Sequence, residues 1–213
     1  MKISQLCDQT GVSVASIKFY LREGLLPSGE RTSANQAEYG DTHVERLRLI
    51  RALIDIGGLS VATARRVLEA VDSTELPLDY VFGIAQYAVS DATLYEPVDP
   101  ESIGLRTVDA VIERMGWDVT DENPGRHGAA RVLDTYAELG HSHLAEISQN
   151  YVEAAELIAR SDLDAVAKRV DVRDMAETVV VGTVLGDGLV ASLRRIAQEH
   201  IAHQMFGTHR RNS

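Results

Sequence analysis

One short segment near the start of the chain carries side chains of the types that bind nucleic acid. Its helical spacing places Val14, Ile17 and Leu21 on one apolar stripe. The remaining polar, cationic and aromatic side chains therefore face the other way, where ammonium and guanidinium groups can bind phosphate and smaller groups can contact bases. The candidate groove and phosphate contacts from this spacing are Ser16, Lys18, Phe19 and Arg22.

A tight turn positions this segment. Two short helical patterns, at residues 3–7 and 14–20, are separated by residues 10–13. Gly11 can adopt the positive φ that ends the first helix, and Ser13 can accept a backbone N–H as the N-cap of the second. The pattern predicts a helix-turn-helix whose second helix is presented to a DNA groove.

Two further elements complete a small head. After Gly24 and Pro27, the polar segment 28–38 predicts a short two-stranded wing that contains one cation, Arg31. A third helix is expected to begin at Asp41 or Thr42, with Thr42 and Glu45 as a capping box. Its outer face carries arginines that either contact phosphates or pair with neighbouring acids, namely Arg46, Arg48 and Arg51.

The order and spacing of these motifs resemble the MerR winged-helix regulators, over about the first third of the chain. The motifs are Ser16-Ile17-Lys18-Phe19-Tyr20, Gly24-Leu25-Leu26-Pro27, the wing from Arg31 to Tyr39, Asp41, Val44-Glu45-Arg46-Leu47-Arg48-Leu49-Ile50 and Gly57-Gly58-Leu59-Ser60. The resemblance implies a homodimer that binds and distorts a near-palindromic promoter site. It also implies that an effector-dependent C-terminal half controls transcription.

The resemblance also implies roles for single residues. By position, Ser16, Lys18, Phe19 and Tyr20 lie in or beside the major groove. Arg31 and Tyr39 belong to the wing, and Arg46 and Arg48 to a helix that contacts the DNA backbone. The chain departs from the family pattern at Lys18, where an Arg is common, and at Asn35-Gln36-Ala37, where a Gly-Tyr-Arg wing is common. We therefore expect contacts and an operator that differ from the common ones.

Composition favours an ordinary globular protein of two domains. The chain has 213 residues, of which 45% are hydrophobic and 25% charged. We predict a DNA-binding domain at residues 1–72, whose charges sum to zero, and a domain at residues 73–213 that carries the whole net charge of −11.

We expect no membrane span or signal peptide, and a cytoplasmic location. The single cysteine, Cys7, excludes an internal disulfide and is expected to pack in the first helix.

The C-terminal two-thirds reads as an all-helical bundle, so the predicted fold class is mainly all-α. This half is loosely similar in pattern to TetR-type regulators. The glycine-rich segment 179–188 is interpreted as a bent helix, followed by a dimer interface that includes Leu189, Leu193, Ile196 and Ile201. The expected helices span residues 78–94, 101–115, 129–139, 142–160, 163–170 and 172–205.

Candidate ligand groups are sparse in this half. His200 and His203 have a spacing that metal ligands can have, but no carboxylate or cysteine accompanies them at a recognised spacing, so we assign no metal and no cofactor. A small-molecule effector is considered because the half is larger than dimerisation requires. The aromatic side chains available to line its cavity are Trp117, Tyr136, Tyr151 and Phe206.

The sequence thus predicts a dimeric transcriptional regulator acting on double-stranded promoter DNA, with RNA polymerase as a further partner. The alternative is a module that sequesters a compound or binds a protein, whose head only autoregulates or bends DNA. Genome-wide binding separates them, because a regulator occupies many strong sites. No arrangement of catalytic residues stands out, so we do not predict an enzyme.

Overall fold

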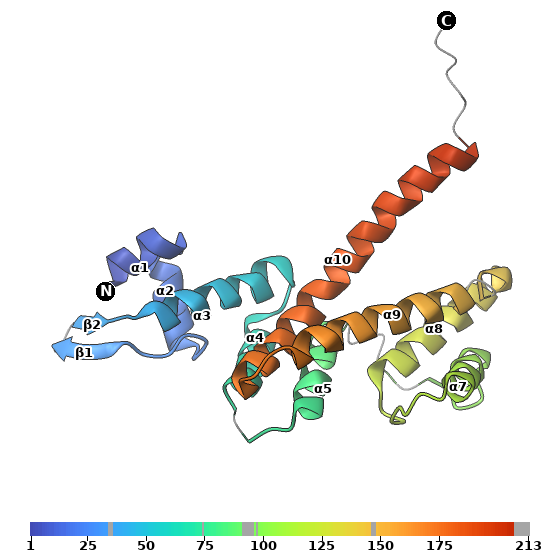
Figure 1. Cartoon of the computed structure of the whole chain (residues 1–213), viewed down its shortest axis with the longest axis horizontal. Coiled ribbons are helices and arrows are strands. Elements are labelled where there is room, and N and C mark those ends of the chain that lie inside the picture. The colour runs from blue at the N-terminus through green and yellow to red at the C-terminus, as the bar shows by residue number, and fades with distance from the viewer. Residues whose placement is uncertain (34–35, 74, 91–95, 97, 146–147, 207–213) are drawn as a thin grey trace, which may run out of the picture. The chain divides into compact units, whose positions relative to one another are not determined.

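The computed structural model describes residues 1–33, 36–73, 75–90, 96, 98–145 and 148–206. It is mainly helical with one two-stranded sheet (Figure 1). The chain forms two compact units, one made of Met1–Ala88 with Val180–Ser213 and the other of Val89–Val179. These limits differ from the division after residue 72 that composition suggested, because the end of the chain belongs to the same unit as its beginning.

The helix-turn-helix forms as predicted. Helix α1 (Ile3–Thr10) ends at Gly11, whose φ is 69° and whose N–H donates to the Cys7 carbonyl at 2.7 Å. Helix α2 (Val14–Arg22) begins after Ser13, whose hydroxyl accepts the Ser16 N–H at 3.0 Å. Both ends of the turn are therefore fixed by local backbone chemistry.

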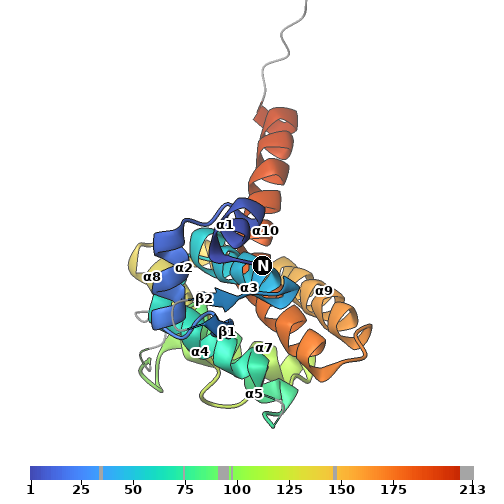
Figure 2. The ribbon, with the colours of Figure 1, turned by 90° about the vertical axis from the view of Figure 1, so that its left-hand side faces the viewer.

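The predicted wing is also present. Strands β1 (Glu30–Ser33) and β2 (Gln36–Glu38) pair antiparallel, with Glu30 opposite Glu38 and Arg31 opposite Ala37. Figure 2 shows the pair beside the three helices that precede and follow it. Asn35 lies outside the described residues.

Helix α3 (Asp41–Arg51) begins at Asp41, one of the two predicted starts, but its cap differs from the prediction. Its N-cap is Gly40, whose N–H donates to His43 Nδ1 at 3.1 Å. The expected capping box of Thr42 and Glu45 is therefore wrong, because the N-cap is Gly40, two residues before Thr42, and the His43 imidazole supplies the reciprocal bond. A single π-helical turn, η1 (Ala52–Ile56), continues α3.

The remaining head helices close its core. Helix α4 (Val61–Asp72) starts at the predicted cap, Ser60, whose hydroxyl accepts the Thr63 N–H at 3.1 Å, and α4 packs against α5 (Leu78–Ala88). Helix α1 packs against α2 and α3. The largest fully buried side chains of this core are Leu6, Ile17, Leu25, Leu26, Leu47, Ile50, Leu53, Val67, Leu68, Val71 and Val81. Val14, expected on the buried stripe, is exposed.

The second unit is built on a helical hairpin, α7 (Ile103–Met115) and α8 (Pro124–Glu138). The two helices approach closely at Gly104, where a Cβ atom would overlap the carbonyl oxygen of Ala130. The Gly104 N–H also donates to Asp134 Oδ1 at 2.7 Å. Absence of a side chain at this position is therefore what lets the helices meet.

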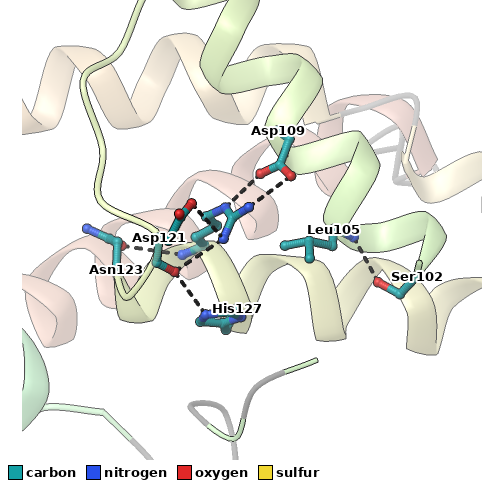
Figure 3. Close-up of polar contacts among 7 residues, drawn as sticks. Ser102, Leu105, Asp109, Asp121, Asn123 and His127 are labelled. Atoms are coloured by element: carbon teal, nitrogen blue, oxygen red, sulfur yellow. Dashed lines mark hydrogen bonds and ion pairs between the residues drawn. The ribbon is translucent and has the colours of Figure 1, made fainter. Parts of the chain in front are cut away.

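The side chain of Arg126 links the loop of this hairpin to both of its helices, and Figure 3 labels two of its partners, Asp109 and Asp121. Arg126 donates from Nε and Nη2 to the two carboxylate oxygens of Asp109, at 2.7 and 3.0 Å, and from Nη1 to the Asp121 carbonyl at 3.2 Å. The bonds to Asp109 raise the pKa of the Arg126 guanidinium above its ordinary value. The loop and both helices are thus joined by one charged side chain.

The last helices differ in extent from the prediction. A 3₁₀ turn, η2 (Ser142–Ala145), precedes α9 (Ser148–Ala167), which runs through the break expected between residues 160 and 163. Helix α10 (Val172–Phe206) is continuous through its glycines. By length and composition alone, α10 is also the one helix among the described residues that could cross a membrane, which the sequence pattern did not lead us to expect.

Candidate nucleic-acid interface

Helix α2 exposes two of the predicted contacts, one of which, Arg22, also pairs with Glu23 at 3.5 Å. Lys18 and Arg22 are exposed, whereas Ile17 beside them is completely buried and anchors the helix. Ser16 is half-buried and its hydroxyl lies 2.9 Å from that of Ser13, so it serves the cap of the helix as well. The two cations are therefore carried on a helix whose other side is fixed to the core.

The two aromatic side chains of α2, Phe19 and Tyr20, lie next to each other, and Phe19 also contacts one of the cations. The Arg22 guanidinium carbon lies 5.4 Å from the centre of the Phe19 ring, a cation–π distance, and the Phe19 and Tyr20 rings are 5.8 Å apart. Both rings are half-buried. Burial, with the nearby Asp55 carboxylate, raises the pKa of the Tyr20 phenol above its ordinary value, so this ring stays neutral at physiological pH.

The two wing residues differ in accessibility. Arg31 on β1 is exposed and can meet phosphate. Tyr39, which follows β2, is buried. Its N–H donates to the Met1 carbonyl at 2.8 Å, its carbonyl accepts from the Met1 ammonium at 2.7 Å, and its ring meets His43 edge-on. Tyr39, which the resemblance assigns to the wing, therefore fixes the base of the wing to the start of the chain.

The three arginines of α3 fall into three environments. Arg46 is only 7% exposed, so it does not lie on the outer face where we expected it. Its Nε donates to the Leu25 carbonyl at 2.9 Å, and its two terminal nitrogens donate to the Asp72 carboxylate. This bidentate ion pair joins α3 to the end of α4 and makes Arg46 a structural residue.

The other two arginines lie on the surface. Arg51 pairs with Asp55 at 3.0 Å, one turn further along. Arg48 is exposed. The accessible cations among the predicted contacts are thus Lys18, Arg22, Arg31 and Arg48.

The predicted ligand-binding aromatics do not gather in a described cavity. Tyr151 and Phe206 are exposed, and Trp117 and Tyr136 are half-buried. A shallow cavity of about 400 Å³ lies instead along α7, lined by Ile103, Arg106, Thr107, Ala110, Val111 and Arg114. Sequence reasoning missed these residues, although their spacing by three and four marks one side of a single helix.

The first third of the chain is similar to known regulatory proteins. The model of the family described as "MerR HTH family regulatory protein" matches residues 1–71. The HTH-type transcriptional regulator ZntR homolog of Haemophilus influenzae is 40% identical over 50 residues, which are 24% of this chain and 37% of that protein. The mercuric resistance operon regulatory protein of Bacillus cereus is 32% identical over 74 residues, or 35% and 55% of the two chains. The matches thus span between about a third and a half of these relatives.

A solved structure extends the likeness to the whole chain. The crystal structure of SCO5550 from Streptomyces coelicolor A3(2), described as a transcriptional regulator, is 34% identical to this protein. The match covers 98% of this chain and 99% of that one, with a TM-score of 0.73. With a MerR head at residues 1–71 and a full-length structural relative of this kind, the chain belongs to the MerR family of DNA-binding transcriptional regulators.

Proposed function

We propose that this protein is a cytoplasmic regulator that binds a promoter site as a homodimer, with α2 of each head in the major groove. The main support for this proposal is that Lys18 and Arg22 are exposed on a helix whose opposite side is buried. Arg31 on the wing and Arg48 on α3 add exposed cations that can bind flanking phosphates. Bases are read in the groove, and the flanking contacts fix the register of the head.

A gel shift on duplex DNA from upstream of the protein's own gene tests this proposal. We expect a retarded band that survives competition by unrelated duplex and weakens as salt rises, because phosphate contacts release counterions. A duplex of the same length and composition in scrambled order is the control. No shift at low salt would contradict the proposal.

We further propose that a small-molecule effector binds the second unit. Its binding would change either the contacts with RNA polymerase or the orientation of the two DNA-binding heads. The cavity along α7 supports this proposal because its volume of about 400 Å³ lies within the range of small-molecule sites. Along α7, Ala110 and Val111 lie between Arg106 and Arg114, and Ile103 lies one turn before Arg106, whose guanidinium also pairs with Glu101. Such a surface suits a compound with an apolar body and a carboxylate.

A thermal-shift screen checks this choice of ligand. We expect medium-chain and aryl carboxylates to raise the melting temperature by a few degrees, whereas the matching amines and alcohols do not. The rise should disappear in the Arg114→Gln variant and persist in Arg160→Gln, an exposed arginine of α9. A rise that persists in Arg114→Gln would place the ligand elsewhere.

A further inference from the structure

We infer that the distal half of α10, residues 186–206, is the surface on which a second copy of this chain docks, helix against helix. The inference deepens the proposed homodimer, on which it rests, by naming the helix and the side chains that meet. This half is the C-terminal part of the helix labelled α10 in Figure 1, and residues 192–206 of it are all exposed.

Large apolar side chains lie exposed along this half of α10. Leu193 is 55% exposed and Ile196 is 66% exposed. Leu189, Leu193 and Ile196 follow one another at spacings of four and three, which places them on one side of the helix, and Val190 and Ile201 lie at the edge of that side. The set is Leu189, Val190, Leu193, Ile196 and Ile201. The opposite side carries Asp187, Arg195 and Gln198, so the helix is amphipathic.

The exposed side is not the side that packs on the protein's own unit. In the proximal half, Val180 and Val184 are buried. Helical spacing puts them opposite Gly182 and Gly186, where an added Cβ would meet nothing within 4 Å. The apolar side of the distal half therefore continues into an open strip of small residues, which permits close approach of another helix.

The surface is large enough to matter for a dimer. Residues 186–206 extend over about 30 Å of helix. Burying a Leu, Ile or Val removes roughly 60 to 120 Å² each, so these five side chains supply roughly 300 to 600 Å² per chain. That is a large part of the roughly 800 Å² per partner that stable complexes bury.

Charges favour a second copy over a lipid bilayer as the occupant. The distal half carries Arg194, Arg195 and Glu199, whereas a membrane-spanning helix is apolar on every side. Close to the apolar row lie Ala197 and Gln204, which are uncharged, and His200 lies on the row one turn after Ile196. Two copies can therefore pair through this side without repulsion between like charges along that flank.

Pairing at this surface would also set the spacing of the two heads. Gly57, at the end of η1, lies so close to Val184 that an added Cβ would overlap its side chain. Helix α10 is thus in direct contact with the end of η1, which continues α3 of the DNA-binding head. A dimer held by α10 then presents its two heads at a fixed separation, as a near-palindromic site requires.

Analytical ultracentrifugation of the full chain tests the inference with two matched variants. Leu193→Glu places a charge in the apolar row, and Gln198→Glu places the same charge on the polar side, where the residue is exposed. We expect a wild-type dimer, an unchanged dimer for Gln198→Glu, and a dissociation constant raised about ten-fold or more for Leu193→Glu. Circular dichroism should be the same for all three, and Ile196→Glu should repeat the effect.

The outcomes separate this inference from the proposed function. A Leu193→Glu protein that stays as dimeric as wild type would overturn the inference, as would a monomeric wild type that sediments with phosphatidylcholine vesicles. A wild-type dimer that dissociates as expected but shifts no promoter DNA would leave the interface standing and remove the proposed function.

Discussion

Replacing Lys18 with Ala is expected to weaken binding of the protein to its promoter site by about 10- to 100-fold. Lys18 is exposed on α2, and no ion pair to it is present among the described residues. Its ammonium group is therefore available to DNA, and in a dimer the substitution removes two such groups. Because the side chain contributes nothing to the core, the melting temperature should not change. Fluorescence anisotropy at several salt concentrations measures the effect.

The salt series also shows which part of the DNA Lys18 meets. If the ammonium binds phosphate, the slope of log affinity against log salt falls by about one for each phosphate that the variant no longer neutralises, and binding to unrelated duplex weakens as well. If it binds a base, the weakening is confined to the promoter sequence. Lys168→Ala removes an exposed lysine of the second unit and is the control. Equal affinities for Lys18→Ala and Lys168→Ala would remove α2 from the interface.

The parts of the head that the sequence predicts well are set by neighbouring residues. Gly11 and Ser13 define the turn because one supplies a positive φ and the other a cap within three residues. The wing follows from its polar composition between two apolar runs. Each depends on interactions between residues that are close in the chain, and these are what local patterns describe.

Long-range contacts could not be predicted in this way. Arg46 lies in an alternation of polar and apolar residues that is typical of a surface arginine, yet its partner, Asp72, lies 26 residues further along. The contact of α10 with the head, between Val184 and Gly57, joins residues that are even further apart in the sequence. Helical periodicity tells which side of a helix is apolar but not which distant element covers it, so the contact of α10 with the head has no local signal in the sequence.

Replacing Arg46 with Met is expected to lower the free energy of unfolding of the head by about 2 to 4 kcal/mol. The variant loses the bond to the Leu25 carbonyl, which is then left without its donor, and both bonds to Asp72. Asp72 is 41% exposed, so water solvates its carboxylate in the variant and limits the cost. Asp72→Asn should cost at least as much, because it leaves the buried guanidinium with only a neutral partner. Urea denaturation followed by circular dichroism measures both.

A comparison with Arg48→Met decides between a structural and a DNA-contacting role for each arginine. Arg48 is exposed on the same helix, so its replacement should change stability by less than about 0.5 kcal/mol but weaken DNA binding and reduce its salt dependence. Arg46→Met should lower stability but, below its melting temperature, leave DNA binding unchanged, because the Arg46 guanidinium lies in the core. If Arg46→Met instead weakened DNA binding as much as Arg48→Met while leaving stability unchanged, Arg46 would have to leave Asp72 and turn outward to phosphate, and its role as the link between α3 and α4 would be wrong.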